Sequence, residues 1–484
     1  MQEFSTVVEW SHALTQKKIS AVEAVDFYAA RIQKCDGEMN AYITTSFDDA
    51  YIQAQKIDAE RAAPGAKMSP LAGIPFGVKD AIDTAGIRST GAAKILDTYT
   101  PSFDSTIVAR VRDAGGIIIG KHNCDAFGHG ASNENSMYGP VKNPWDTSRV
   151  SGGSSGGSAA SVAADTCAFS IAEDTGGSIR YPAGLCGITG LKVSYGRNSR
   201  YGAMPMASSL DTVGPIARTA EDIALIMEHI AGYDPRDATT SDAPVPQYTK
   251  EIKKTIRGKK IGVPQQFFVD SLDDEIRSTI ETALDELRSA GAEIVSISLP
   301  HTEYAIATYY VLVPCEDSSN LARLDGMRYG VRADAPDLFH TYTHSRAQGF
   351  PPEVKRRIMI GTFALSHGYY DAYYVQAQKA RTHIKNDFEE AFKKVDVIVA
   401  PTSPEVAFKL GEKTNDPMKM YLADIFVGSA SLAGVCSLSV PCGFVKGLPV
   451  GMQFIGPRLR EEVPLMFGHQ FQQITNWHTQ HPLI

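Results

Sequence analysis

The chain has 484 residues, of which 43% are hydrophobic and 21% are charged. This balance is typical of a soluble globular protein with a large buried core. The formal net charge is −8, from 47 basic and 55 acidic residues, which argues against a surface that binds nucleic acid unaided.

The lack of a recognisable targeting signal and the pattern of cysteines predict a cytoplasmic protein. The N-terminal stretch MQEFSTVVEW has neither a basic region nor a long apolar run, so we expect no signal peptide. Apolar runs elsewhere, such as residues 395–401, are far shorter than the roughly 20 residues of a membrane span. The seven cysteines are scattered singly without a C-x-x-C motif. We therefore expect reduced, buried thiols, with neither a disulfide framework nor a metal site.

The N-terminal part of the chain predicts alternating helices and short strands. A capping box at Ser20 and Glu23 begins a helix whose apolar residues recur at helical spacing. Two β-rich runs follow, at residues 73–79 and 115–121, and a helical segment that ends at Gly115 lies between them. This order of strand, helix and strand predicts an α/β sheet covered by helices.

The rest of the chain continues this pattern, with one change of character. Residues 219–234 predict an amphipathic helix, and residues 271–300 predict a helix followed by a strand. Residues from about 315 to 392 are polar, rich in tyrosine and mostly helical, and predict a helical layer that walls a site. Residues 393–484 return to strands, including a hairpin through Val445-Lys446-Gly447.

Residues 151–160, SGGSSGGSAA, contain eight glycines or serines in ten positions. A flexible linker has this composition, but the run is short and an apolar helix follows it at once. A phosphate-binding loop would need a lysine beside Gly157, and none is present. The G-x-S-x-G match at Ser154 would need a hydrophobic strand before it, whereas residues 141–151 predict a loop.

Ser178 has a better context for a nucleophile. It lies in DTGGSIR, residues 174–180, directly after two glycines and an apolar run that predicts a strand. Unhindered backbone N–H groups there can converge on one oxygen, which is what an oxyanion hole requires. A serine hydroxyl alone is a weak nucleophile, so Ser178 also needs a base.

Lys79 is the candidate for this base. It lies at the end of the apolar strand GIPFGVKD, and lysine is rarely buried without a partner. Burial disfavours the charged form of an amine, and a neutral amine can take a proton directly or through an intermediate hydroxyl. The alternative is that Lys79 lies at a strand end and extends its amine to solvent. Taken alone, the residue favours this second interpretation.

The combination of these motifs resembles the amidase signature family. Lys79 in LAGIPFGVKD is followed 75 residues later by Ser154 in GGSSGGSAA, and after a further 24 residues by Ser178 in DTGGSIRYPAG. The resemblance implies one large α/β domain over residues 1–484, with a mixed twisted sheet covered by helices on both faces. Its core motifs would occupy residues 70–235.

The resemblance also implies a Ser-cisSer-Lys triad. Ser178 would be the nucleophile, Ser154 the bridging serine held by a cis peptide bond, and Lys79 the general base. Ser178 would attack an amide carbon while Ser154 passes its proton toward Lys79, and water would then hydrolyse the acyl-enzyme. Four backbone N–H groups would form the oxyanion hole, those of Thr175, Gly176, Gly177 and Ser178.

Within the family, the whole chain is similar to the A subunits of glutamyl-tRNA(Gln)/aspartyl-tRNA(Asn) amidotransferases. Stretches outside the catalytic core that carry this resemblance include SSNLARLDGMRYG and EVKRRIMIGTFALSHGYYDAYY. The resemblance implies a glutaminase that hydrolyses free glutamine and supplies ammonia to amidate Glu-tRNA(Gln), Asp-tRNA(Asn) or both.

The resemblance also suggests residues that bind glutamine. Arg357 would pair with the substrate α-carboxylate, because an arginine fork matches a carboxylate, and Arg356 is the competing choice. Asp424 would pair with the α-ammonium group, and one of Tyr309 or Tyr310 would line the pocket. Surface charge and ordinary aromatic packing are the alternative explanation for these residues.

Partners and cofactors follow from the same resemblance. A B subunit would bind the misacylated tRNA, use ATP and Mg²⁺ and receive the ammonia through a tunnel, and a small C subunit would clamp the two together. We expect no cofactor, metal or membrane contact in this chain, and its acidic balance fits a protein that leaves tRNA to its partner. Two alternatives remain open, a free-standing amidase for another small amide and a catalytically silent assembly subunit.

Three residues depart from the usual pattern of the family. Tyr181 stands in place of glutamine in SIRYPA, Ser151 in place of proline before GGSSGG, and Asn198 in place of an apolar residue in YGRNSRYG. None belongs to the triad. Tyr181 and Ser151 adjoin it, however, and therefore bear on the shape of the pocket and on activity.

Overall fold

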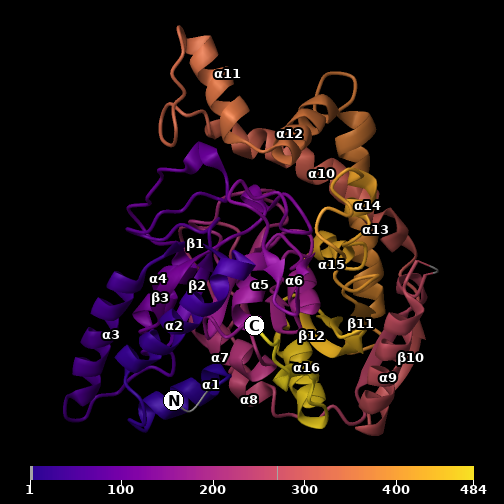
Figure 1. The fold of residues 1–484 in the computed structure, drawn as a ribbon. Helices are drawn as coiled ribbons and strands as arrows, with labels where there is room; N and C mark the ends of the chain where they lie inside the picture. The colour runs from indigo at the N-terminus through magenta and orange to yellow at the C-terminus, as the bar shows by residue number, and fades with distance from the viewer. Residues whose placement is uncertain (1–3, 270) are drawn as a thin grey trace.

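A computed structural model describes residues 4–269 and 271–484 of the chain. Residues 1–3, on which the expectation of no signal peptide partly rests, lie outside this part. The described residues form an eleven-stranded mixed sheet surrounded by helices (Figure 1). One continuous core of buried residues runs from Val7 to Phe471, which fits a single domain.

The strand order of the large sheet is β1-β3-β2-β6-β8-β7-β12-β13-β11-β9-β10, and a separate small sheet pairs β4 with β5. In chain order the strands are β1 (Tyr42–Thr45), β2 (Pro75–Lys79), β3 (Ile117–His122), β4 (Lys142–Asn143), β5 (Asp146–Val150), β6 (Phe169–Asp174), β7 (Thr189–Lys192), β8 (Thr212–Ala217), β9 (Lys260–Pro264), β10 (Glu293–Ile297), β11 (Val397–Pro401), β12 (Cys436–Val445) and β13 (Leu448–Gly456).

Helices connect most of these strands. They are α1 (Val7–Thr15), α2 (Ala21–Met39), α3 (Phe47–Ala62), α4 (Thr106–Asp113), α5 (Gly156–Ala163), α6 (Arg180–Cys186), α7 (Ala220–Ile230), α8 (Tyr248–Glu251), α9 (Asp274–Ser289), α10 (Ala305–Asn320), α11 (Leu338–Gly349), α12 (Pro352–Ala364), α13 (Gln376–Ala391), α14 (Pro417–Tyr421), α15 (Gly428–Ala433) and α16 (Glu462–Ile474). No helix in the described ranges has the length and apolar character needed to cross a bilayer.

The register of β2 and β6 places the candidate residues at one edge of the sheet. The two strands are parallel, with Phe76 opposite Phe169 and Val78 opposite Ile171. The rings of Phe76 and Phe169 stack at 5.0 Å, which fixes this register inside the core. Because the strands run in the same direction, their carboxyl ends meet, and Lys79 lies beside the loop that carries Ser178.

Local sequence signals are confirmed where they mark the ends of elements. The capping box at Ser20 and Glu23 begins α2, with both reciprocal hydrogen bonds present. β12 and β13 form the expected hairpin through a two-residue turn at Lys446 and Gly447, whose φ angles are 53° and 79°. Positive φ at both positions is the geometry that matches the twist of the flanking strands. The predicted α/β class with a mixed sheet and covering helices is likewise confirmed.

The prediction of a loop before Gly152 is wrong in part. Residues 146–150 form β5, which pairs with β4 outside the large sheet. The N–H of Val150 also donates to the carbonyl of Phe408, 3.0 Å away. The ladder with β4 spans only residues 142–150, and Phe408 lies more than 250 positions further along the chain, so no local pattern could indicate this second contact.

The helical layer begins earlier than residue 315. It starts with α10 at Ala305 and continues to the end of α13 at Ala391, and α11 projects from the upper edge of the molecule in Figure 1. α10 contains Pro314. The apolar residues of this helix are spread around its circumference and do not form one stripe. The residues after 393 also contain α14, α15 and α16 besides the strands.

Candidate active site

Lys79 ends β2 with its side chain inside the protein. The residue has no exposed surface, and its Nζ lies 2.8 Å from Oγ of Ser154, within hydrogen-bond distance. The alternative in which the amine extends to solvent is therefore wrong. The two residues are 75 positions apart in the sequence, and the fold brings their functional atoms into direct contact.

The backbone around Ser154 is fixed by the loop that follows β3. A cis peptide bond joins Gly153 to Ser154. The N–H of Asp125 donates to the carbonyl of Ser154 at 3.1 Å, and the N–H of Gly156 donates to Oδ1 of Asn133 at 2.9 Å. SGGSSGG is thus a buried and specifically bonded segment rather than a flexible tether.

Ser178 lies next to this segment, on the short loop between β6 and α6. The N–H of Ser155 donates to the carbonyl of Ser178 at 3.2 Å, so the two serine-bearing loops are held side by side. Ser178 retains 9% of its surface exposed in an otherwise buried loop. The fold therefore brings Lys79, Ser154 and Ser178 into one region.

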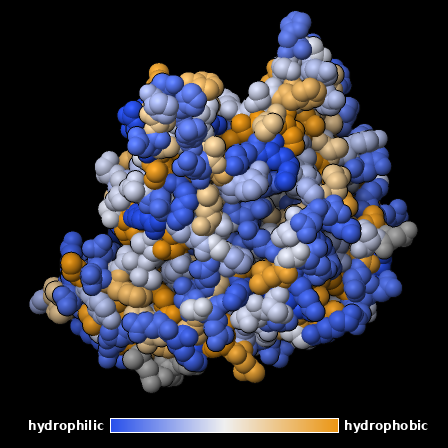
Figure 2. Space-filling view, turned by 45° about the horizontal axis from the view of Figure 1, so that its top comes forward, coloured by the Kyte–Doolittle hydropathy of each residue, from blue (hydrophilic) through white to orange (hydrophobic). Residues whose placement is uncertain are grey.

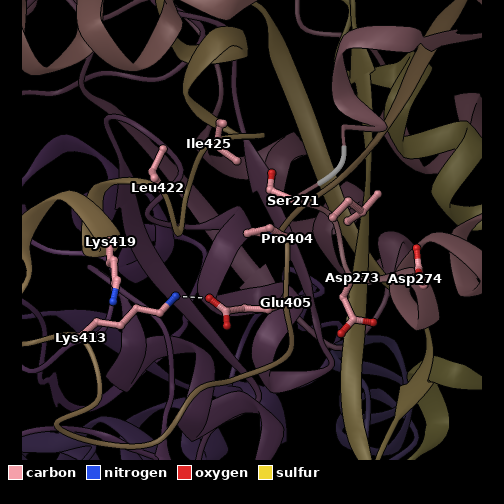
Figure 3. Close-up of a pocket in the computed structure, with 10 residues that line it drawn as sticks. Ser271, Asp273, Asp274, Pro404, Glu405, Lys413, Lys419, Leu422 and Ile425 are labelled. Carbon is pink, nitrogen blue, oxygen red and sulfur yellow. Dashed lines mark hydrogen bonds and ion pairs between the residues drawn. The ribbon is translucent and has the colours of Figure 1, made fainter.

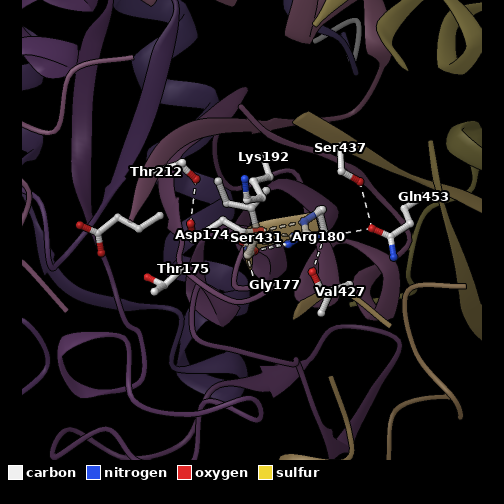
Figure 4. Close-up of polar contacts among 12 residues, drawn as sticks. Asp174, Thr175, Gly177, Arg180, Lys192, Thr212, Val427, Ser431, Ser437 and Gln453 are labelled. Carbon is white, nitrogen blue, oxygen red and sulfur yellow. Dashed lines mark hydrogen bonds and ion pairs between the residues drawn. The ribbon is translucent and has the colours of Figure 1, made fainter. Parts of the chain in front are cut away.

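A buried ion pair holds the Ser178 loop in shape (Figure 4). Asp174 accepts hydrogen bonds from Nε and Nη2 of Arg180, each at 3.0 Å, and neither residue is exposed. Burial acts to raise the pKa of Asp174. The charge and hydrogen bonds of the Arg180 guanidinium lower it by more, so the pKa of this carboxyl is below its usual range. Removing one partner of such a pair typically costs about 3–5 kcal/mol.

Arg180 also ties the loop to the C-terminal strands. Its Nη1 donates to the carbonyl of Val427 at 2.9 Å and to Oε1 of Gln453 at 3.0 Å. Gln453 in turn donates to the carbonyls of Pro401 and Phe426, at 2.9 and 2.8 Å. Figure 4 shows Val427 and Gln453 converging with Asp174 on the guanidinium from different elements.

The backbone N–H groups of this loop differ in availability. The N–H of Gly177 donates to Oδ1 of Asp174 at 2.8 Å, so it is already engaged. Those of Thr175, Gly176 and Ser178 have no hydrogen-bond partner within residues 4–269 and 271–484. These three groups remain as donors for an oxyanion.

Glu173 is a member of the site that sequence reasoning missed. Its Oε2 lies 3.5 Å from Nζ of Lys79. Burial raises the pKa of Glu173 to about 8, although the Lys79 amine opposes this shift. The one sequence signal was an acidic residue at the end of a strand that the pattern predicts to be buried.

Arg357 and Arg356 have different surroundings. Arg357 is 3% exposed, its Nε donates to Oε1 of Glu353 at 2.9 Å, and its guanidinium lies 5.1 Å from the ring centre of Tyr310. The ring of Tyr421 lies 5.5 Å from the same guanidinium. The side chain of Arg356 is 46% exposed. Only Arg357 therefore points into the protein.

Tyr309 lies against the Ser178 loop and against the ring of Tyr310. A Cβ atom at Gly176 would lie only 2.5 Å from the Tyr309 hydroxyl oxygen, so the phenol packs directly on the loop backbone. Burial raises the pKa of Tyr309, and the charges of Arg357 and Asp424 also act on it. Tyr309 contacts the loop, whereas Tyr310 stacks on Arg357.

Asp424 supplies the opposite charge. Its carbonyl accepts from the N–H of Val427 at 3.1 Å, and the Val427 side chain closes against Gly177. Burial raises the pKa of Asp424 to about 7, while the charge of Arg357 opposes the shift. Arg357 and Asp424 act on each other electrostatically, and groups of these two kinds match the two charged groups of an α-amino acid.

Two cavities lie near these residues. One, of about 220 Å³, is lined by Gly130, Ser132, Glu353, Arg357 and Tyr421, among others. The other, of about 610 Å³, is an open groove that contains no triad residue (Figure 3). Leu422 and Ile425, which stand on either side of Asp424 in the sequence, line this groove, and Lys413 contacts Glu405 within it.

The three residues that depart from the family pattern fit into the described structure. Tyr181 is 1% exposed and packs among apolar side chains that include Val427, although its hydroxyl finds no partner in the described ranges. Ser151 donates to the carbonyl of Gly152 at 3.0 Å, and Asn198 donates to that of Val213 at 2.8 Å. Tyr181 therefore shapes the wall behind the Ser178 loop.

Comparisons with known proteins identify the family of the chain. A family model described as Amidase matches residues 23–465. The chain is 51% identical over 477 residues to the A subunit of glutamyl-tRNA(Gln) amidotransferase from Roseiflexus sp. (strain RS-1), covering 99% of this chain and 98% of the relative. Its counterpart from Koribacter versatilis (strain Ellin345) is 52% identical over 459 residues, covering 94% and 95%.

Solved structures give the same result. The A subunit of glutamyl-tRNA(Gln) amidotransferase from Thermotoga maritima is 38% identical with a TM-score of 0.77, and 93% of each chain is covered. The native peptide amidase from Stenotrophomonas maltophilia is 29% identical with a TM-score of 0.83, covering 98% of this chain and 97% of that one. The family model covers most of the chain, from residue 23 to residue 465. The chain therefore belongs to the amidase signature family.

Proposed function

We propose that this chain is the glutaminase subunit of a tRNA-dependent amidotransferase. The observation that carries the proposal is the 2.8 Å contact between Lys79 Nζ and Ser154 Oγ, buried beside the loop of Ser178. The names of the relatives support the place of the chain in such a complex, since they are A subunits of glutamyl-tRNA(Gln) amidotransferases.

In the proposed reaction, Ser178 Oγ attacks the side-chain amide carbon of glutamine. Ser154 takes the proton of Ser178 and passes its own to Lys79, which protonates the leaving nitrogen. The free N–H groups of Thr175, Gly176 and Ser178 stabilise the oxyanion. Ammonia leaves, and water then releases glutamate from the acyl-enzyme by the same proton path in reverse.

Charge complementarity orients the substrate. Glu353 and the two flanking tyrosine rings hold Arg357, and its remaining guanidinium nitrogens bind the α-carboxylate. Asp424 binds the α-ammonium group. Tyr309 packs on Gly176 in the Ser178 loop, so that it limits the position of the substrate side chain.

Partners would use the ammonia and supply the remaining chemistry. We infer a B subunit that binds misacylated tRNA and uses ATP and Mg²⁺, and a C subunit that joins the other two in the cytoplasm. Figure 2 shows hydrophobic side chains around a hollow in the upper part of the molecule. The helical layer also exposes large apolar residues of the kind that partners cover, namely Leu338, Phe339, Met359, Phe363 and Tyr370.

An ammonia-release assay tests the proposal. The purified chain is given glutamine alone, then with B and C subunits, ATP, Mg²⁺ and misacylated tRNA. We expect ammonia release from glutamine and amidation of the tRNA in the complete mixture. Activity on other amides with glutamine inert would indicate a free-standing amidase. Amidation that occurs with added ammonium salts but not with glutamine would indicate a silent assembly subunit.

The charged groups around the substrate give a pH prediction. Below pH 7, Asp424 is protonated and loses its attraction for the α-ammonium group, since its pKa is about 7. We therefore expect kcat/KM for glutamine to fall on the acid side of pH 7 through a rising KM. Asp424→Asn should raise KM at pH 8 and remove the KM change below pH 7.

Arg357 provides the matching measurement. Arg357→Lys keeps the charge but loses the fork, and we expect KM for glutamine to rise about 10- to 100-fold through loss of charge-assisted hydrogen bonds. Arg356→Lys is the control on the same helix and should leave KM unchanged. Amidation driven by ammonium salts should be normal in each variant. An unchanged KM in Asp424→Asn and Arg357→Lys would remove both residues from the substrate site.

A further inference from the structure

Asp211 and Thr212, at the start of β8, face the strand end that leads into the Ser178 loop. β8 runs antiparallel to β6, and Thr212 stands opposite Asp174 in their register. Asp211 and Thr212 are buried, with 8% and 2% of their surfaces exposed. The proposed reaction assigns no role to either residue.

Thr212 holds the peptide unit that supplies one of the proposed oxyanion donors. Its Oγ1 donates to the carbonyl oxygen of Asp174 at 2.7 Å (Figure 4). This carbonyl and the N–H of Thr175 belong to the same peptide unit. Because a trans peptide unit is planar, its carbonyl and its N–H point in opposite directions. The hydrogen bond from Thr212 therefore fixes the direction in which the N–H of Thr175 points.

Asp211 holds the side chain of the same residue. Oγ1 of Thr175 donates to Oδ1 of Asp211 at 2.7 Å. The carboxylate also accepts from the N–H of Ala207 at 3.0 Å and from the N–H of Met206 at 3.1 Å. Burial raises the pKa of Asp211 to about 6, although the bonds from Thr175 and Ala207 oppose the shift, so the group is ionised at neutral pH. A hydrogen bond to an ionised acceptor is roughly twice as strong as a neutral one.

The turn that Asp211 closes also contacts the loop beside Ser154. A Cβ atom at Gly128 would lie 3.0 Å from Sδ of Met206 and 3.7 Å from Oγ of Ser154. The carbonyl of Met206 accepts from Nδ2 of Asn320 at 3.0 Å, which ties this turn to α10. Asp211 is therefore bonded on one side to the loop of the nucleophile and on the other to a turn packed near the bridging serine.

We propose that Asp211 and Thr212 are positioning residues for the oxyanion hole, and that together they aim the N–H of Thr175 at the oxygen of the substrate amide. An oxyanion donor is effective only if it is held in place before charge develops on that oxygen. Thr212 holds the peptide unit and Asp211 holds the side chain, so the unit cannot rotate away. The inference rests on the proposed function, because it concerns the oxyanion formed when Ser178 attacks.

Two isosteric substitutions remove these bonds one at a time. Thr212→Val and Thr175→Val each delete a hydroxyl and keep the backbone N–H groups. In the assembled complex we expect each variant to lower kcat for glutamine about tenfold or more and to leave KM within about threefold of wild type. Thr212→Ser and Thr175→Ser restore the hydroxyl and should recover most of the lost kcat. In an Asp211→Asn background, Thr175→Val should lower kcat less than about threefold further, because both changes act on one contact.

Thr189→Val is a matched control. Thr189 is buried in β7, and its hydroxyl donates to the carbonyl oxygen of Arg218 at 2.9 Å, so the variant loses a bond of the same kind as Thr212→Val. We expect its kcat to stay within about twofold of wild type. Amidation from ammonium salts on each preparation measures how much complex is intact. A merely structural role would give Thr212→Val and Thr189→Val the same kcat.

Other outcomes decide against the inference. A kcat within about twofold of wild type in Thr212→Val or Thr175→Val would overturn the role of the bond that the variant removes. If Thr212→Val does not fold, the two Thr175 variants decide, because they leave Thr212 and the other bonds of Asp211 intact. A wild-type complex that releases no ammonia from glutamine contradicts the proposed function instead. The variants are then compared on an amide that the chain does hydrolyse, since any acyl transfer needs the oxyanion hole. A wild-type chain that hydrolyses no amide would overturn both.

Discussion

Ser178→Ala is expected to abolish amidation that depends on glutamine while leaving amidation from ammonium salts at the wild-type rate. Ser178 is the only member of the proposed triad that forms a bond to the substrate carbon, and loss of a nucleophile lowers kcat on the order of 10⁴- to 10⁶-fold. The partner subunits do not need this oxygen when ammonia is supplied from solution. The measurement compares both nitrogen sources on the same preparation of the complex.

Ser161→Ala is a matched control for this substitution. Ser161 is fully buried in α5 and its hydroxyl has no partner in the described part of the chain, so it resembles Ser178 in size but lies outside the site. We expect it to retain both activities. If Ser178→Ala kept the glutamine-dependent rate, the nucleophile would have to be another group, and the triad assignment would be wrong.

Lys79→Met is expected to lower glutaminase kcat by about 10⁴-fold, because no other amine lies within reach of Ser154 Oγ in the described site. The substitution has a second effect, since it leaves the Glu173 carboxyl without the amine that lies 3.5 Å away. The double variant Lys79→Met/Glu173→Gln removes that unpaired acid. We expect the double variant to melt at a higher temperature than Lys79→Met and to be equally inactive.

Glu173→Gln alone completes this experiment. It keeps Lys79 and Ser154 in contact, so we expect measurable glutaminase activity with an altered pH profile, because a group whose pKa is about 8 has been removed beside the amine. If the double variant recovered activity along with stability, Lys79 would be a structural residue rather than the base.

The sequence predicts those parts of the fold that depend on neighbouring residues. The cap at Ser20, the turn at Lys446 and the strand that ends at Lys79 all follow from short-range patterns. The family resemblance supplied the three triad positions, and the structure brings them together. Contacts set by the packing of distant segments could not be predicted in this way.

The residues that were missed show this limit. β5 pairs with β4 and is also bonded to the distant Phe408, and Glu173 reaches Lys79 only because β2 and β6 are adjacent and parallel. Nε2 of His129 lies 2.7 Å from Oδ2 of Asp317, and nothing near His129 in the sequence indicates this partner. In each case, the chemistry depends on a register or a helix position that one sequence does not encode locally.

The hydrogen bonds of Arg180 tie the Ser178 loop to segments that are synthesised last. The guanidinium that shapes the Ser178 loop is held by Val427, Ser431 and Gln453, all in the last sixty residues of the chain. During synthesis on the ribosome, the triad residues emerge long before these anchors. A nascent or C-terminally truncated chain therefore lacks the groups that hold Arg180, so the Ser178 loop takes its described shape only after the last sixty residues have joined the fold.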